Sequence, residues 1–385
     1  WGLPQIKDIA SISSGSTPNR NNSEYWNGNI AWVTTGELSS GHVNHTSELI
    51  TVKAVKETKM RIYPQGTLLM AMYGQGKTRG TVAILEIDAA VNQACAAITV
   101  KDGKSKFLFY QLKNSYQDIR KLSNTGNQEN LNADIIKTYQ VPWAPDEEQE
   151  RISTILTTQD KVIKLKETRL AEKQRQKKYL MQQLLTGKKR LPGFNGAWKT
   201  DCLGKLFFER KETNCENIEM LAITGTQGII PRKELDLKDN SSEDKSKYLR
   251  VCVGDIGYNT MRMWQGVSAY SNYEGIVSPA YTILKPSSSI NAKYFAYLFK
   301  MSEIVFLFYR FSQGLVDDTR NLKYENFKKI KVCYPPDMKE QTAIAEVLSA
   351  ADREIELLQQ DIEQEKQKKK ALMQLLLTGI VRIKT

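Results

Sequence analysis

The chain contains an internal repeat, and this repeat limits its possible folds more than any other feature. Residues 148–191 align with residues 340–383 at a constant offset of 192, with 17 of 44 positions identical and no gap. The motif LLTG occurs in both copies, at 184–187 and at 376–379. Shared helical composition does not produce a gapless match of this density, so the sequence predicts one structural unit built twice.

The segments that precede the two repeat copies match more loosely. WGLPQIKDI at the start corresponds to WKTDCLGKL at 198–206, and GTLLMAMYGQG at 66–76 corresponds to GDIGYNTMRMWQG at 254–266. The chain therefore alternates a variable globule with a conserved segment. We predict a first globule at 1–145, a long helix at 146–187, a linker at 188–197, a second globule at 198–336, a second long helix at 337–379 and a C-terminal tail at 380–385.

Each conserved segment has the features of a long helix. Acidic residues crowd the first turn of the first copy, in DEEQE at 146–150, and a glycine follows each copy, at Gly187 and at Gly379. Negative charge suits a helix N-terminus, and glycine is common just past a C-terminus. A helix of about 40 residues is roughly 60 Å long at about 1.5 Å per residue.

A narrow apolar stripe with a seven-residue spacing follows each predicted helix. Its members are Leu156, Ile163, Leu170 and Leu184 in the first helix, and Leu348, Ile355, Ile362 and Leu376 in the second. Such a stripe needs a partner helix of similar length, and the other copy is the nearest one. Because the first helix leads into the second globule and the second helix starts from it, the pair should be antiparallel. This arrangement is cyclic, with adjacent termini and a pseudo-twofold axis.

The two globules have mixed secondary-structure patterns. Short apolar runs such as TLLMAMY at 67–73 and ACAAITV at 94–100 indicate strands, and helical patterns occupy 106–122 and 292–311. The predicted fold class is therefore α+β, with two globular domains separated by two long antiparallel coiled-coil helices.

The charge balance favours a polyanionic partner. The formal net charge is +12 at pH 7, which suits nucleic acid. The five cysteines form no CxxC pair, so the sequence does not indicate a zinc ribbon or a disulfide framework. No run approaches eighteen apolar residues and the first residues do not resemble a secretory signal, so we expect a cytoplasmic protein without a membrane partner.

Two motifs suggest chemistry but have simpler interpretations. AMYGQGKT at 71–78 fits a relaxed phosphate-loop pattern, with Ala71 in place of the first glycine. A phosphate loop must open a helix, whereas RGTVAIL follows here, so we interpret the segment as a polar hairpin tip. His42 and His45 are the only histidines, and their surroundings are typical of a surface loop rather than a metal site or a catalytic triad.

Signatures of DNA methyl transfer are also missing. The chain has no glycine-rich cofactor loop after a first strand, and Tyr334-Pro335-Pro336-Asp337 reverses the Asn/Asp-Pro-Pro-aromatic order of amino-methyltransferases. We therefore expect no catalytic residue, no cofactor and no metal ion in this chain, and no enzyme activity from the chain alone.

Polar and basic loops with interspersed aromatic residues remain, and they occur in both globules. Arginine and lysine suit guanine edges and phosphates, and asparagine and glutamine suit adenine edges. Part of these residues can equally belong to ordinary solvated loops. The candidate DNA-binding residues are Ser16, Thr17, Asn19, Arg20, Thr34, Thr35, Tyr73, Gln75, Lys77, Arg79, Asn127, Gln128, Arg210, Lys211, Thr224, Arg232, Lys233, Asn259, Arg262, Trp264, Gln265, Gln313 and Arg320.

With two divergent globules, each followed by a near-identical helix ending in LLTG, the chain resembles the specificity (S) subunits of type I restriction-modification systems over its whole length. GSTPNRNNSEYWNGNIAWVTTGEL and GDIGYNTMRMWQGVSAYSNYEGIVSPAY look like the recurrent signatures of that family's target-recognition domains. The resemblance implies that each globule reads one half of a bipartite, asymmetric double-stranded DNA target, with the helix pair setting the gap.

The same resemblance implies partner proteins that carry the chemistry. Two adenine-N6 methyltransferase (M) subunits would bring S-adenosylmethionine, and restriction (R) subunits would bring ATP- and Mg-dependent activities. Two other hypotheses stay open at this point. One is a nucleotide-dependent enzyme built around Lys77 and Thr78, and the other is a coiled-coil scaffold that does not bind DNA.

Overall fold

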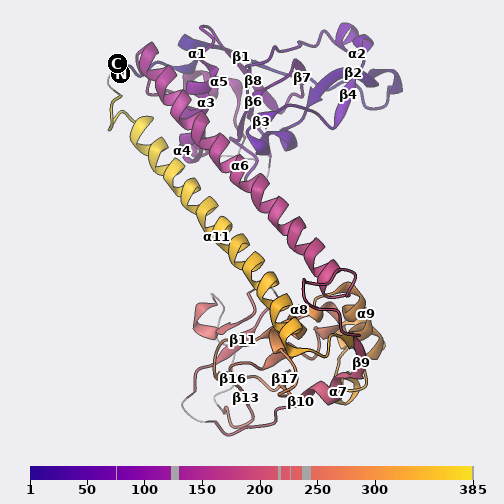
Figure 1. The fold of residues 1–385 in the computed structure, drawn as a ribbon. Helices are drawn as coiled ribbons and strands as arrows, with labels where there is room; N and C mark the ends of the chain where they lie inside the picture. Colours follow the sequence, from indigo (N-terminus) through magenta and orange to yellow (C-terminus); the bar gives the residue numbers. More distant parts are fainter. Residues whose placement is uncertain (75, 123–129, 216–217, 226, 236–243, 384–385) are drawn as a thin grey trace. The chain divides into compact units, whose positions relative to one another are not determined.

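The chain forms two compact units, each with its own globule and its own stretch of paired helices (Figure 1). The computed structural model describes residues 1–74, 76–122, 130–215, 218–225, 227–235 and 244–383. The first unit comprises residues 1–167 and 361–385, and the second unit comprises residues 168–360.

The two long helices are α6 (Asp146–Leu184) and α11 (Met338–Leu376), with 39 residues each. Both end three residues before the predicted boundary, and the glycine that follows each of them has a positive φ, 72° at Gly187 and 75° at Gly379. Glycine tolerates this left-handed conformation, which ends a helix.

Within each unit the helices run antiparallel. In the first unit the Lys166 ammonium lies 2.8 Å from the Asp361 carboxylate, and Asp160, earlier on α6, pairs with Lys369, later on α11. In the second unit the Lys173 ammonium lies 2.8 Å from the Glu354 carboxylate, and Lys177, later on α6, pairs with Asp352, earlier on α11. As the residue number rises on one helix it falls on the other, which is the antiparallel order that the sequence predicts.

The residues of the predicted apolar stripe are buried or half-buried. Leu156, Ile163, Leu184, Leu348, Ile362 and Leu376 are buried, and Leu170 and Ile355 are half-buried. The ends of the stripe extend into the globules, because Leu156 and Leu376 belong to the first core and Leu184 and Leu348 belong to the second. In each unit the helix segments therefore share their hydrophobic contacts with the globule of that unit.

The first globule is built on a five-stranded sheet. The strand order is β1 (Ala10–Ser14), β8 (Cys95–Val100), β5 (Leu68–Ala71), β6 (Val82–Leu85) and β3 (His42–Val43). A second sheet has the order β4 (Glu48–Ile50), β2 (Trp26–Val33) and β7 (Ala89–Val91). The helices are α1 (Ile6–Ile9), α2 (Val52–Glu57), α3 (Ser105–Asn114), α4 (Tyr116–Lys121) and α5 (Ala133–Thr138).

Strand β5 of the five-stranded sheet is apolar at every position because both of its faces are buried. Leu68 and Met70 face one core, together with α3 and both long helices, whereas Leu69 and Ala71 face a second core. Because successive side chains of a strand point to opposite faces, a sheet buried on both sides needs apolar residues at every position.

The second globule has a four-stranded sheet with the order β10 (Phe207–Glu209), β17 (Tyr281–Pro286), β14 (Ile256–Asn259) and β15 (Ser268–Tyr270). Three strand pairs accompany it: β11 (Leu221–Ile223) with β12 (Ile229–Pro231), β13 (Leu249–Val251) with β16 (Gly275–Val277), and β9 (Lys199–Cys202) with β18 (Lys331–Tyr334). The helices are α7 (Leu203–Leu206), α8 (Ala292–Leu298), α9 (Ser302–Phe311) and α10 (Tyr324–Phe327).

Each long helix has a buried glutamate in its first turn, and this glutamate binds the arginine that follows the other long helix. In the first unit the Glu148 carboxylate accepts hydrogen bonds from the Trp1 indole (2.8 Å), from the Arg382 guanidinium (2.8 and 2.9 Å) and from the Ile383 amide (3.1 Å). This contact, called the first clasp below, closes the N-terminus of the chain against its C-terminal tail.

The second unit repeats the glutamate–arginine part of this contact with the residues at the repeat offset. Glu340 takes the place of Glu148 and accepts hydrogen bonds from Arg190 at 2.5 and 2.7 Å. Arg190 lies over the Trp198 ring, as Arg382 lies over the Trp1 ring, with guanidinium-to-centroid distances of 5.6 and 5.7 Å. The two halves of the sequence repeat therefore share the glutamate–arginine and arginine–tryptophan contacts as well as the long helices.

A second repeated contact joins each globule to the long helices. In the first unit the Tyr110 hydroxyl donates to the Asp160 carboxylate at 2.8 Å, and Lys369 pairs with the same carboxylate. In the second unit the Tyr297 hydroxyl donates to the Asp352 carboxylate at 2.6 Å, and Lys177 pairs with it.

Candidate nucleic-acid interface

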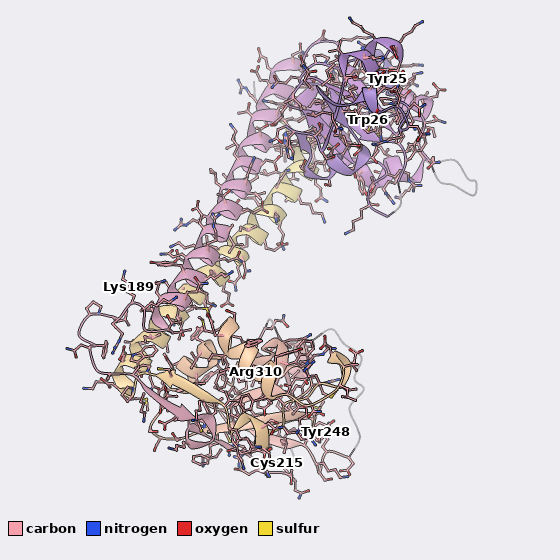
Figure 2. All side chains as sticks on the ribbon, turned by 90° about the vertical axis from the view of Figure 1, so that its right-hand side faces the viewer. Tyr25, Trp26, Lys189, Cys215, Tyr248 and Arg310 are labelled. Atoms are coloured by element: carbon pink, nitrogen blue, oxygen red, sulfur yellow. The ribbon has the colours of Figure 1, made fainter. Side chains whose placement is uncertain are left out.

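In the first globule, the loop at 15–22 is held against strand β2 by two tryptophans. The Trp32 indole donates to the Ser16 carbonyl at 3.1 Å, and the Trp26 indole donates to the Asn19 carbonyl at 3.2 Å. Gly15 allows the close approach, because a Cβ there would lie 1.9 Å from the Val91 carbonyl oxygen. The candidate residues of this loop therefore have a fixed backbone. Figure 2 labels Trp26 and its neighbour Tyr25.

Arg20 is the most constrained side chain of this loop. Its guanidinium carbon lies 4.2 Å from the Trp26 ring centroid and 5.0 Å from the Trp32 ring centroid. Two of its nitrogens meet the Glu48 carboxylate, one of them at 3.0 Å. The hydrogen bond to Glu48 raises the pKa of Arg20, so the group stays charged. Its side chain remains exposed and therefore presents a pre-oriented cation at the surface.

The end of β2 lies beside this loop. The Thr34 amide donates to the Glu37 carboxylate at 2.7 Å, and the Thr17 hydroxyl contacts Gln93. Thr34 and Thr35 are half-buried. The sequence reasoning did not include Gln93, which lies in the short turn after β7 and has no distinctive motif around it.

The other candidates of the first globule lie in the connection between β5 and β6. Tyr73 and Lys77 are exposed, whereas the Arg79 side chain is buried. Helix α4 supports the turn, because the Tyr116 hydroxyl donates to the Lys77 carbonyl at 2.6 Å. Strand β6 follows this turn where a phosphate loop requires a helix, so the geometry matches the predicted hairpin tip. Gln75, Asn127 and Gln128 lie outside the described residues.

In the second globule, one surface brings several candidates together. The Arg320 guanidinium lies 4.1 Å from the Tyr309 ring centroid, and the Trp264 ring packs edge-on against Tyr309 at 6.2 Å. Phe306 also stacks on Tyr309, with 6.4 Å between the ring centroids. Arg310, labelled in Figure 2, is four residues after Phe306 on α9 and therefore lies on the same side of that helix.

We call this surface the aromatic–arginine face, and it consists of Arg262, Trp264, Phe306, Tyr309, Arg310 and Arg320. Arg262 precedes the 3-10 turn η4 (Met263–Gln265) and Gln265 ends it, with 3.4 Å between the Arg262 guanidinium and the Gln265 amide oxygen. Asn259 ends strand β14 shortly before this turn, and its side-chain oxygen accepts from the Met261 amide at 2.9 Å.

The loop at 313–321 is joined to the same face. Gln313 and Asn321 exchange two backbone hydrogen bonds of 2.8 and 2.7 Å, and the Leu322 amide donates to the Thr260 carbonyl at 2.8 Å. The face therefore combines three of the sequence candidates, Arg262, Trp264 and Arg320, with adjoining polar loop ends. Sequence reasoning missed Phe306, Tyr309 and Arg310, because they lie within an apolar helix rather than in a polar loop. The i, i+3, i+4 spacing of aromatic and basic residues is the signal that could have found them.

Arg210 has a different role from the one that its loop position suggests. Its guanidinium donates to the Asp255 carboxylate at 2.7 and 3.1 Å, and its side chain is only 10% exposed. The hydrogen bond to Asp255 raises the pKa of Arg210. The same carboxylate accepts from the Cys252 amide at 2.8 Å. Arg210 therefore holds two loops together inside the globule.

The remaining candidates of the second globule have contacts elsewhere. Lys211 pairs with Glu209 at 3.0 Å, and Lys233 pairs with Glu219 at 2.6 Å. Arg232 begins the 3-10 turn η3 (Arg232–Glu234). The Thr224 hydroxyl donates to the Gly228 carbonyl at 3.0 Å, inside the hairpin of β11 and β12.

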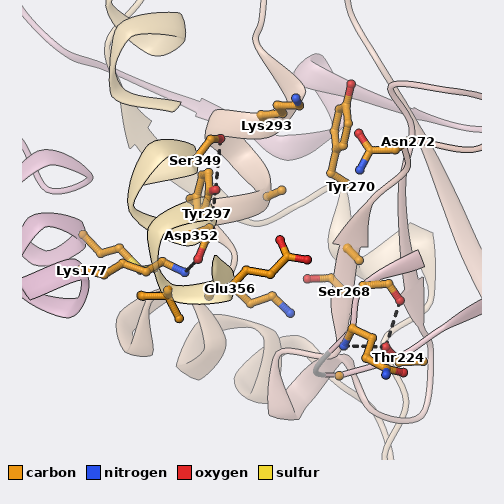
Figure 3. Close-up of a pocket in the computed structure, with 18 of the residues that line it drawn as sticks. Lys177, Thr224, Ser268, Tyr270, Asn272, Lys293, Tyr297, Ser349, Asp352 and Glu356 are labelled. Carbon is orange, nitrogen blue, oxygen red and sulfur yellow. Dashed lines mark hydrogen bonds and ion pairs between the residues drawn. The ribbon is translucent and has the colours of Figure 1, made fainter. Parts of the chain in front are cut away.

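Thr224 also borders a cleft of about 900 Å³ in the second unit (Figure 3). Lys293 on α8 and Lys177 on α6 line the cleft together with Asp352 and Glu356 on α11. The Asp352 carboxylate is already occupied by Tyr297 and Lys177. The cleft thus lies directly beside the contact that anchors this globule to its helices.

The structure places His42 in an ion pair rather than in a metal site. The His42 ring nitrogen lies 2.9 Å from the Glu86 carboxylate on the exposed edge of the sheet. Among the described residues, no group of three or more His, Cys, Asp or Glu side chains is placed to hold a metal ion. Within the same residues, no helix combines the length and the apolar character needed to cross a membrane.

Comparison with known proteins gives a consistent family. The sequence model described as "Type I restriction modification DNA specificity domain" matches residues 1–175 and 204–367. The type I restriction enzyme MjaIX specificity subunit of Methanocaldococcus jannaschii is 33% identical over 181 residues, which are 45% of this chain and 41% of that subunit. The match therefore spans less than half the length of that relative.

Two further comparisons extend over the whole chain. A second specificity subunit of the same organism, provisionally assigned to the type I enzyme MjaX, is 24% identical over an alignment that covers 100% of this chain and 94% of that protein. The crystal structure of a type I restriction-modification S subunit from M. genitalium superposes with a TM-score of 0.62 at 13% identity, covering 98% of this chain and 96% of that one. At this identity the likeness shows a shared fold.

Proposed function

The chain belongs to the type I restriction-modification DNA specificity family, and we propose that it reads a bipartite, asymmetric DNA target, one half with each globule. Members of this family confer sequence specificity on a restriction-modification system. One contrast between the two units supports a bipartite target: the contacts at the start of the long helices are repeated, whereas the candidate DNA-binding surfaces are not. Glu148 and Glu340 each accept hydrogen bonds from the arginine at the corresponding repeat position, whereas the candidate surfaces of the two globules differ in residues and in geometry.

The candidate surfaces are chemically suited to DNA. Exposed arginines beside aromatic rings can contact phosphates and guanine edges, while the flanking amides can contact adenine edges. In the first globule Arg20 has this setting. In the second globule Arg320 packs over the Tyr309 ring with a side chain that is 16% exposed, and Arg262 on the same face is exposed. Two unlike readers predict two unlike half-sites, and we propose that the helix pair sets the gap between them.

We further propose that the chemistry resides in partner subunits. Two adenine-N6 methyltransferase subunits would supply S-adenosylmethionine, and restriction subunits would supply ATP- and Mg-dependent translocation and cleavage. A repeated surface feature supports two equivalent docking places. Leu165 on α6 is 70% exposed and Leu357, at the repeat offset on α11, is 64% exposed. Single exposed leucines are common on protein surfaces, so the support comes from their recurrence at the same position of the two helix copies.

An exchange of the first globule tests the proposal. A hybrid carrying residues 1–145 of another family member should change one half of the methylated sequence and leave the other half unchanged. The measurement is sequencing of N6-methyladenine across the genome of a strain that carries the hybrid. The unmodified chain, expressed in the same strain, is the control.

Three other outcomes would contradict the proposal. Changes in both half-sites would show that the globules do not read independently. A chain that binds methyltransferase subunits but has no preferred DNA sequence would be a scaffold. ATP hydrolysis by the purified chain that disappears in a Lys77→Ala variant would indicate a nucleotide-dependent enzyme.

A further inference from the structure

The loop at 313–321 presents an apolar tip beside the aromatic–arginine face. Leu315 is 100% exposed and the next residue, Val316, is 59% exposed. Single exposed apolar residues are common on protein surfaces, but this pair lies in the loop whose Arg320 packs over the Tyr309 ring. The two residues therefore form a narrow apolar tip on a loop that is attached to the aromatic–arginine face through Arg320.

The backbone of this loop is built to hold the tip in place. Gln313 and Asn321 close its base with two backbone hydrogen bonds. Gly314 has φ of 132°, and a Cβ at this position would lie 2.7 Å from the Arg320 Cα. Only glycine fits such a close approach, so the chain turns sharply just before Leu315 and projects it away from the globule.

The charges around the tip favour a polyanion as its partner. Arg320 stacks on Tyr309 and also donates to Asp317 at 3.2 Å, which neutralises one of the two aspartates of the loop. Arg262 and Arg310 on the same face are exposed. A tip one or two residues wide is too narrow to provide a stable protein docking surface, which needs roughly 800 Å² on each partner.

We propose that Leu315 is a wedge that inserts between stacked base pairs of the DNA read by the second globule. This inference rests on the proposed function and adds the way in which the DNA is deformed. Proteins that bend DNA insert leucine and similar side chains at base steps, and the lost stacking is offset by additional contacts with the bent duplex. Val316 and the aromatic–arginine face would supply such contacts.

The test uses the full chain assembled with its methyltransferase subunits and DNA that carries the target mapped by methylome sequencing. The adenine analogue 2-aminopurine, whose fluorescence rises on unstacking, is placed in turn along the second half-site, apart from the methylated adenine that the methyltransferase itself would flip. Binding of the unmodified complex should raise the fluorescence at one base step. Leu315→Ala should abolish that rise and weaken binding roughly tenfold.

The matched control is Val253→Ala, an exposed aliphatic residue of the same unit in the turn after β13. This variant should keep both the fluorescence and the affinity. If the unmodified complex prefers its mapped target without any rise in fluorescence, the wedge is refuted and the proposed function stands. If the complex has no preference for the mapped target, both are refuted. If Leu315→Ala prevents assembly with the methyltransferase, the tip contacts protein and the wedge is refuted.

Discussion

Removal of the first clasp should loosen both ends of the chain. The Glu148 side chain is 1% exposed, and hydrogen bonds from Arg382 and Trp1 hold its pKa at about 2, against an ordinary value of 4.5. At about 1.4 kcal/mol for each tenfold change, this difference corresponds to roughly 3 kcal/mol. Arg382 is half-exposed, so solvent screening reduces the expected contribution to about 2 kcal/mol.

Hydrogen exchange measured by mass spectrometry can follow this loss locally. In Glu148→Gln, amide exchange in peptides covering residues 1–6 and 377–383 should be faster by roughly 30-fold, which is the rate factor for about 2 kcal/mol. Glu150→Gln, an exposed neighbour on the same helix, is the control and should leave exchange unchanged. Equal exchange in the two variants would refute the energetic role of the clasp.

The pH dependence provides an independent check. Because folding lowers the pKa of Glu148, the unfolded state binds the proton more readily, and the clasp contributes its full stability above about pH 4.5. The contribution should be lost as the pH falls from about 4.5 towards about 2. Thermal unfolding of the unmodified chain and of Glu148→Gln should therefore differ at pH 6 and converge near pH 2. A difference that stays constant over this range would contradict the assigned protonation.

Two further predictions concern stability. Leu348→Ala removes a fully buried side chain from the second core and should lower the free energy of unfolding, measured by urea denaturation, by about 2–5 kcal/mol. The control Leu357→Ala, at an exposed site on the same helix, should change this free energy by less than about 0.5 kcal/mol. Arg210→Ala leaves the buried Asp255 carboxylate without its partner and should cost about 3 kcal/mol, whereas Lys211→Ala should leave stability unchanged. Equal effects within either pair would contradict the burial that the structure assigns.

The sequence alone was enough to predict the architecture, because the repeat is strong and the two long helices depend on local features. Acidic residues in the first turn, a glycine after the last turn and an apolar stripe along one side are readable without knowledge of distant contacts. The connectivity then left an antiparallel pair as the natural arrangement, and the family comparisons agree with the resulting fold.

The tertiary structure was needed to assign individual side chains. Arg210 and Arg20 occupy similar polar segments in the sequence. In the structure Arg210 is buried and paired with Asp255, whereas Arg20 lies at the surface over the rings of Trp26 and Trp32. Likewise, Tyr309 belongs to an apolar helix and meets Arg320 only after folding. Helix periodicity is a local property of the chain, whereas the partner of a charged side chain is chosen by residues that folding brings near from distant positions, and this is why the architecture was predictable and the surface was not.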